Sequence, residues 1–308
     1  MEKVVADPRP AKQPWNKSSK LASFTGGRGF ADATLITLAF LLAAVVFGLL
    51  LSVLWSVVSA GAGAMSPQFL YQNNRYISTT TSLDYGGVGH AILGTLWLVL
   101  LATMVALPLG LAIAVYLTQS QSKLRNLVRS ITQALAGLPS VVSGLFVLSI
   151  ISFLGAQKSG IFGALALFPL MLPTVARVAE EALRLVPADL RLAALGLGAP
   201  NYRAFFQVIL PAAKSGIITA LLLGLARVVG ETAPLILTIQ ANNGTNLNPF
   251  DGGVATLPTY IYGFISAGYA SSITRAWGAS LVLLILVGIL FITARLLTAD
   301  KKKKKAKK

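Results

Sequence analysis

The sequence contains no cysteine and a single histidine among its 308 residues. The lack of cysteine excludes disulfide frameworks, thiol catalysis and cysteine-based metal sites, and one histidine is too few for a histidine metal cluster. Charge is also scarce, since 12% of the residues are charged, against about 25% in an ordinary soluble domain. The hydrophobic fraction is 55% and the mean hydropathy is +0.72. This composition indicates an integral membrane protein, and we expect no metal and no other cofactor.

Long apolar runs predict where the chain crosses the membrane. A hydrocarbon core about 30 Å thick needs roughly 20 mostly apolar helical residues. Six segments qualify: residues 33–58, 90–117, 127–154, 160–176, 215–239 and 277–296. The fourth is short and is broken by Pro169 and Pro173. We therefore predict an all-α integral membrane protein with six transmembrane helices.

The same runs divide the chain. We expect a basic N-terminal segment at 1–31, a first transmembrane helix at 32–59, a core of five helices at 86–297 and a lysine-rich tail at 298–308. The core includes a long polar loop at 177–214, and two other loops, about 60–89 and 240–275, form short connections.

Lysine and arginine are distributed unevenly between the loops. They gather in the N-terminal segment, in the loop that holds Lys123, Arg125 and Arg129, in loop 177–214 and in the tail. The remaining loops hold Arg75, Lys158 and Arg275. The positive-inside rule then places both termini and the two basic loops in the cytoplasm. The net charge of +16 thus reflects topology, and we interpret the lysine tail as a solvated anchor; contact with anionic lipid or nucleic acid is the alternative.

Loop 177–214 contains residues that typically start and end a helix. Pro187 and Asp189 suit a first helical turn, and Gly198 suits a helix end. We predict a helix over about 188–197 and a second element that reaches Leu210 and Pro211. A short helix outside the membrane must bury its apolar face, either on its own bundle or on a separate cytoplasmic partner.

The spacing of this loop resembles the "EAA" loop of ABC importer permeases. In that motif, Glu-Ala-Ala is followed by three residues, Gly, nine residues and Ile-x-Leu-Pro, and the segment forms a coupling helix that docks on an ATPase subunit. The matching positions in this chain are Ala193, Ala194, Gly198, Val208, Leu210 and Pro211. Leu192 stands where the motif has glutamate, so any polar contact of that glutamate is lost or replaced here.

Four further segments narrow the resemblance. "GGVGHAILGTLWLVLLATMVALPLGLAIAVYL" from Gly86, "LAGLPSVVSGLF" from Leu135, "EEALRLVP" from Glu180 and "ARVVGETAPL" from Ala226 resemble the permeases of the phosphate-specific ABC importer. "GETAPL" is similar to the PstA type rather than to the PstC type.

The resemblance implies a type-I importer permease fold in a prokaryotic plasma membrane, which is the inner membrane where there are two. It also implies the partners: a second, related permease of the PstC type, two copies of a cytoplasmic ATPase and an extracytoplasmic phosphate-binding protein. The chain has no G-x-x-x-x-G-K-[ST] loop to cradle ATP, so ATP hydrolysis falls to the partner. We expect a transport subunit that meets membrane lipids and is not itself an enzyme; we expect no nucleic acid partner.

The fifth predicted span carries two opposite charges, Arg227 and Glu231. On one helix, residues four apart share a face. Unpaired, the two charges cost about 5–7 kcal/mol at a span centre, roughly what the apolar residues of the span return. One interpretation is an ion pair that fixes helix packing. The other is that Arg227 receives an anion in transit while Glu231 holds the guanidinium when no anion is bound.

Other polar residues complete the predicted substrate pathway. Thr232 lies beside Glu231, and Ser140 and Ser143 lie beside Pro139 and Gly144 in the third span. Small residues in a span also serve as close-packing contacts, so the two serines have two interpretations. The function favoured is phosphate import. Alternatives are a permease for another solute, such as sulfate or molybdate, an ATP-independent carrier or channel, and, remotely, a membrane-embedded enzyme that uses Glu231.

Overall fold

The computed structural model describes residues 28–305 and divides into two units, Met1–Trp55 and Ser56–Lys308. Most of the predicted N-terminal segment (1–31) and the last three residues of the predicted tail lie outside the described residues. The first unit holds most of α1 (Arg28–Gly61), whose residues 32–53 are all exposed. A helix that is apolar on every side suits a membrane environment, in agreement with the first predicted span.

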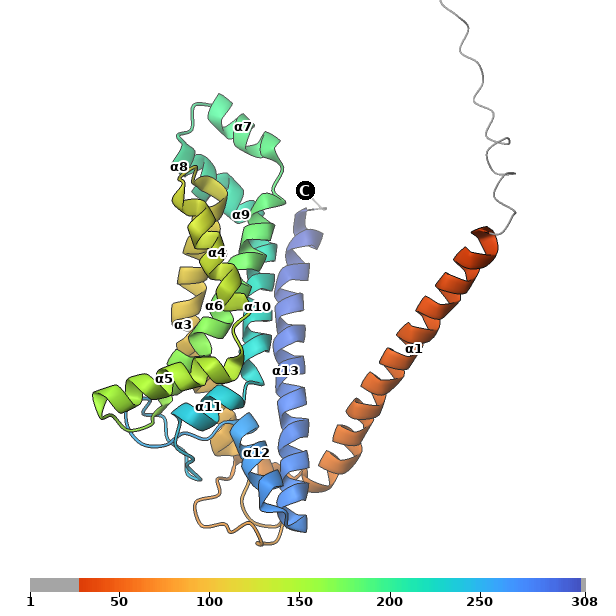
Figure 1. Cartoon of the computed structure of the whole chain (residues 1–308), viewed down its shortest axis with the longest axis vertical. Coiled ribbons are helices and arrows are strands. Elements are labelled where there is room, and N and C mark those ends of the chain that lie inside the picture. Colours follow the sequence, from red (N-terminus) through yellow and green to blue (C-terminus); the bar gives the residue numbers. More distant parts are fainter. Residues whose placement is uncertain (1–27, 306–308) are drawn as a thin grey trace, which may run out of the picture. The chain divides into compact units, whose positions relative to one another are not determined.

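Helices also build the second unit, whose described residues contain no strand (Figure 1). In chain order they are η1 (Ala62–Ala64), α2 (Pro67–Tyr71), α3 (Gly89–Gln119), α4 (Leu124–Ala136), α5 (Ser140–Leu154), α6 (Gly160–Arg184), α7 (Ala188–Gly196), α8 (Asn201–Arg203), the π-helical η2 (Ala204–Ile209), α9 (Leu210–Ala212), α10 (Lys214–Val229), α11 (Ala233–Thr238), α12 (Leu257–Ala267) and α13 (Ala270–Lys305).

The core of this unit forms where the long helices pack side by side. α6 lies against both α3 and α10, and α10 also contacts α13. Fully buried residues such as Leu98, Leu167, Met171 and Val228 fill the space between α3, α6 and α10. Among the described residues, four helices are long and apolar enough to cross a membrane alone, and the number reaches six when each of two bent pairs counts as one span.

The fourth predicted span differs from its prediction. α6 runs without interruption from Gly160 to Arg184, through both Pro169 and Pro173. The predicted break is therefore wrong, and the helix continues past residue 176 to Arg184. Proline removes one helical hydrogen bond, but neighbouring helices restrain a proline-containing span, and α6 packs against α3, α5, α10 and α11.

The third and fifth predicted spans are not continuous helices. α4 and α5 meet at an angle of 100° across residues 137–139, where Gly137 ends α4 and Pro139 precedes α5. α10 ends at Val229, and α11 begins at Ala233. Gly and Pro are the strongest helix breakers, and one of each lies at or beside both breaks: Gly137 and Pro139 at the first, Gly230 and Pro234 at the second. In this chain they outweigh the apolar composition of the surrounding residues.

Two connecting segments lie at the end of the bundle opposite α7 (Figure 1). Asn74 is fully buried there; its amide donates to the Tyr260 hydroxyl on α12 at 2.9 Å, and its carbonyl oxygen accepts from the backbone of Gly87 at 2.9 Å. Arg275 on α13 is also fully buried and donates to the carbonyls of Ser82 and Tyr85 at 2.6 and 2.7 Å. These bonds order the connections, and α12 is a helix that the sequence reading missed.

Candidate functional site

Arg227 lies in the last turn of α10, and its side chain is exposed. Its Nη1 donates to the Thr174 hydroxyl on α6 at 3.3 Å. At about 1.5 Å per residue, Arg227 lies roughly 20 Å along α10 from Lys214. An arginine at that depth has to face a water-filled cavity or another protein surface, because lipid would leave its charge unsatisfied.

Glu231 lies outside the helix that carries Arg227. α10 ends at Val229 with Gly230 as its cap, and the Glu231 amide donates to the Val228 carbonyl at 3.2 Å. The prediction that the two charges lie four apart on one helix is therefore wrong, and the described ion pairs do not include one between them. The half-buried Glu231 occupies the break between two helices, a position typical of substrate and ion sites in transporters.

Two of the other pathway residues lie at the starts of two helices that pack together, α5 and α11. Thr232 is the residue before α11, and Ser140 is the first residue of α5. α5 and α11 pack together so closely that a Cβ on Gly144 would lie 2.7 Å from the Pro234 Cα. The two helix breaks are thus joined through the helices that follow them.

Ser143 bonds a neighbouring helix and does not lie at a helix break. Its buried hydroxyl donates to the Ala166 carbonyl on α6 at 2.6 Å. This bond ties α5 to α6, as expected for the packing interpretation of the two serines.

The sequence reading missed a row of polar residues on α6. Thr174, Arg177 and Glu181 follow each other at helical spacing, so they share one face. The Arg177 Nε lies 4.0 Å from the Glu181 Oε1, and both side chains are exposed. Because Thr174 also contacts Arg227, the row extends from Arg227 toward the end of α6 that leads to α7. The signal in the sequence was the three- and four-residue spacing of polar residues after Pro173.

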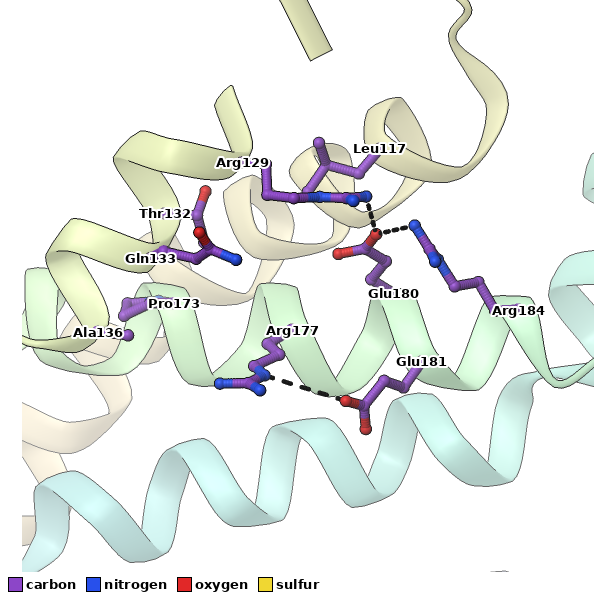
Figure 2. Close-up of a pocket in the computed structure, with 10 residues that line it drawn as sticks. All are labelled: Leu117, Arg129, Thr132, Gln133, Ala136, Pro173, Arg177, Glu180, Glu181 and Arg184. Atoms are coloured by element: carbon purple, nitrogen blue, oxygen red, sulfur yellow. Dashed lines mark hydrogen bonds and ion pairs between the residues drawn. The ribbon is translucent and has the colours of Figure 1, made fainter. Parts of the chain in front are cut away.

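A pocket of about 210 Å³ lies between α4 and α6 (Figure 2). Glu180 is at its centre: its Oε1 accepts hydrogen bonds from Arg129 of α4 at 2.7 Å and from Arg184 of α6 at 2.6 Å. The full lining is Leu117, Arg129, Thr132, Gln133, Ala136, Pro173, Arg177, Glu180, Glu181 and Arg184. Sequence reading assigned Glu180 and Glu181 only to the end of a span, since the partner on α4 is 51 residues away.

The residues after α6 form the two helical elements that the sequence predicts. α7 occupies Ala188–Gly196, and a second helical segment covers Asn201–Ala212, with Leu210 and Pro211 in its last turn. Gly198 has a φ of +84°, which favours glycine at a helix end. α7 contacts η2, with Ala194 buried.

Several positions of this loop are open to a partner. Leu192 and Leu197 are 64% and 90% exposed, and Ala193, Gly198 and Pro211 are exposed as well, whereas Val208 and Leu210 are half-buried. Leu192 of α7 and Leu197, the residue after it, therefore form an exposed apolar surface that no described residue covers.

Comparison with known proteins places the chain in a family. Residues 106–302 match the family described as the binding-protein-dependent transport system inner membrane component. The chain is 42% identical over 214 residues to phosphate transport system permease protein PstA 1 of Mycobacterium tuberculosis (strain ATCC 25618 / H37Rv), covering 69% of this chain and 70% of that protein. The chain belongs to the PstA family of permeases.

Other relatives extend the match over most of this PstA-family chain. The PstA proteins of Yersinia pestis and Pasteurella multocida are 37% and 32% identical to it. The alignments cover 87% and 90% of this chain, and 90% and 97% of those proteins. Membership makes this chain a transport component of a bacterial inner membrane, and not an enzyme.

Solved structures agree on the fold. A bacterial alginate ABC transporter in complex with an alginate-bound periplasmic protein matches with a TM-score of 0.63 and 18% identity, over 88% of this chain and 96% of that one. The MetNI methionine ABC transporter in an inward-facing conformation matches with a TM-score of 0.56 and 20% identity, over 70% and 94%. The type-I ABC importer permease fold predicted for this PstA-family chain is confirmed.

Proposed function

We propose that this chain is the permease subunit through which an ATP-driven importer moves inorganic phosphate into the cytoplasm. The observation that carries the proposal is Arg227, whose exposed guanidinium in the last turn of α10 donates to the neutral Thr174 hydroxyl. Relatives named phosphate transport system permease proteins share up to 42% of aligned residues with it. A free forked donor suits a phosphate oxyanion.

The geometry suggests the route of the anion. Phosphate reaches Arg227 beside the break that holds Glu231, and then passes along the α6 face of Thr174 and Arg177. Glu231 competes for the positive charge and so limits how tightly the anion is held, which conduction requires. Thr232 and Ser140 lie at the starts of the helices beyond the breaks, and we assign them to the same pathway. Ser143 supports the pathway by holding α5 against α6.

Energy enters through the coupling loop. An external ATPase docks on the exposed surface formed by Leu192 of α7 and Leu197, the residue after it. The conformation of the loop depends on the other motif positions: Ala193, Ala194, Gly198, Val208, Leu210 and Pro211. The loop leads into α10 through a bend of 66°, so its motion reaches Arg227 across one joint and then along α10.

We propose the remaining partners on the same basis. A second, related permease of the PstC type covers the exposed row of Arg227 and Arg177, two ATPase copies bind one coupling loop each, and an extracytoplasmic phosphate-binding protein delivers the anion at the opposite end. Both termini then lie in the cytoplasm, with lipids around α1.

The test is uptake of radiolabelled phosphate in cells that lack their own phosphate permeases but contain the partner subunits. Arg227→Gln should lower uptake by about 10- to 100-fold, because hydrogen bonds to a charged group contribute about 1.5–3 kcal/mol. Arg125→Gln, which removes an arginine of α4 outside both the pathway and the coupling loop, is the matched control. Subunit levels in the membrane are measured in parallel.

Competition decides the solute. Unlabelled phosphate should abolish the signal, while equal sulfate or molybdate should leave it unchanged. Full uptake by Arg227→Gln at normal subunit levels would remove Arg227 from the pathway, and stronger competition by sulfate or molybdate would replace phosphate as the substrate.

A further inference from the structure

The pocket between α4 and α6 carries more positive charge than its own residues neutralise. Three arginines, Arg129, Arg177 and Arg184, face two glutamates, Glu180 and Glu181. The Arg177–Glu181 contact is long, at 4.0 Å. The lining residues therefore carry an excess of one positive charge in a pocket of about 210 Å³. The lining also includes the apolar residues Leu117, Ala136 and Pro173 (Figure 2).

Most hydrogen-bond donors in this pocket are unused. A guanidinium has five N–H donors, yet Arg129 and Arg184 each direct one Nη2 bond to the same atom, the Glu180 Oε1. Their side chains are 35% and 48% exposed, so a solute from water can reach them. The Gln133 amide also lines the pocket.

We propose that this pocket is a second oxyanion site, which binds a phosphate group in exchange for the Glu180 carboxylate. Two guanidinium groups from different helices converge on one oxygen atom, and an oxygen of a phosphate takes the same place and accepts further donors that a single carboxylate oxygen leaves free. The site does not include Arg227, which belongs to α10 and contacts Thr174, but it shares Arg177 with the proposed pathway.

The location gives the site a role. It lies near the end of α6 that leads into α7, the helix assigned to ATPase docking, so, if the proposed function holds, phosphate leaving the pathway arrives beside it. Glu180 now links α4 to α6 through Arg129. A bound phosphate replaces Glu180 as the group that links α4 to α6. The fraction of pockets that hold phosphate therefore rises with the phosphate concentration at this end of the transporter.

Two sources supply the same chemistry. Free inorganic phosphate enters from water, and the headgroup of an anionic phospholipid enters from the membrane surface. Lipid has access because α4 exposes the apolar side chains of Leu124, Leu127 and Ile131. The experiment has to separate the two sources.

The test is equilibrium binding of radiolabelled inorganic phosphate to the assembled transporter in phosphatidylcholine nanodiscs, without binding protein. The transporter carries Arg227→Gln, which silences the pathway site. Saturable binding is expected. Glu180→Gln should tighten it about tenfold, because the competing carboxylate is gone, and the triple change Arg129→Gln, Glu180→Gln, Arg184→Gln should weaken it at least tenfold while leaving no unpaired charge in the pocket.

Arg125→Gln is the matched control, because it removes an arginine from α4 outside the pocket lining and should not alter binding. Binding that falls when phosphatidylglycerol replaces part of the lipid, in the parent but not in the triple variant, identifies the headgroup as the occupant in membranes; unchanged binding identifies free phosphate. Absence of saturable binding, or binding that the triple change leaves intact, overturns the site. Failure of phosphate uptake by the unaltered transporter would instead overturn the proposed function and leave this binding result standing.

Discussion

At the scale of single residues, Arg227 and Arg275 show that two arginines in similar apolar surroundings have opposite roles. Arg227 is exposed and has a neutral partner at 3.3 Å. Arg275 is fully buried, with one guanidinium nitrogen bonded to backbone carbonyls and its Nε and Nη1 without a hydrogen-bond partner. We propose that the first meets a solute, whereas the second orders the connection before α3.

Arg275→Met should destabilise the protein by about 2–4 kcal/mol, because a fully buried charged donor and its bonds to the carbonyls of Ser82 and Tyr85 are lost. Thermal unfolding of the purified transporter measures the loss. Arg75→Met, at an exposed arginine whose backbone amide bonds Asn73, is the control and should change stability little. Equal stability of the two variants would show that the Arg275 bonds contribute nothing.

The sequence could identify Arg227, but it could not separate these two roles. The apolar run around Arg227 made an intramembrane charge visible, and the family resemblance gave it a function. The burial of Arg275 depends on residues 81–85, about 190 positions earlier in the chain, and no local pattern records such a contact. The Arg129–Glu180 pair was missed for the same reason.

At the scale of elements, the two helix breaks are joined by the contact between α5 and α11. Gly144 makes the contact possible, since a Cβ there would lie 2.7 Å from a backbone atom of Pro234. Gly144→Ala should therefore cost about 1–3 kcal/mol through overpacking, although alanine favours a helix over glycine. Phosphate uptake should fall with it, because the starts of both helices move.

Gly263→Ala is the matched control for that change, since it lies in α12 with open space around the added carbon. Thermal unfolding and uptake are measured for both variants. A Gly144→Ala protein as stable and as active as Gly263→Ala would show that the α5–α11 contact yields easily.

The exposed surface formed by Leu192 of α7 and Leu197, the residue after it, leads to a second prediction, which concerns ATPase docking. Leu197→Asp should leave the stability of the chain unchanged, because the side chain is 90% exposed, but should lower ATPase recovery in a pull-down by about tenfold. Leu247→Asp, exposed at the opposite end of the bundle, is the control. Undiminished ATPase recovery with Leu197→Asp would contradict docking on this face.

Element boundaries followed from the sequence where local chemistry acts alone. Pro187 and Gly198 delimit α7 within a residue or two of the prediction. Composition failed at Gly137–Pro139 and Gly230–Thr232, where a few residues break an apolar run, and at α6, where packing keeps two prolines inside a helix.

At the scale of the whole molecule, the orientation in the membrane is still a prediction from the distribution of lysine and arginine. The absence of cysteine makes it simple to test, because each introduced cysteine is the only thiol. A membrane-impermeant maleimide added to spheroplasts should label Gln157→Cys, at an exposed position of a connection predicted to be outside, and not Ser122→Cys, at an exposed position of a basic loop predicted to be inside. Labelling after lysis is the control, and the reverse pattern would invert the topology.

The breaks at residues 137–139 and 230–232 also govern how the protein is made. Backbone that leaves the helix inside a bilayer has to be covered by protein or water, since lipid offers no hydrogen bonds. If the proposed second permease provides this cover, it has to be present when these spans leave the insertion machinery. A copy synthesised in excess of its partner is an orphan with uncovered breaks, and we expect membrane proteases to remove it, so that the cellular abundance of this subunit follows that of the partner.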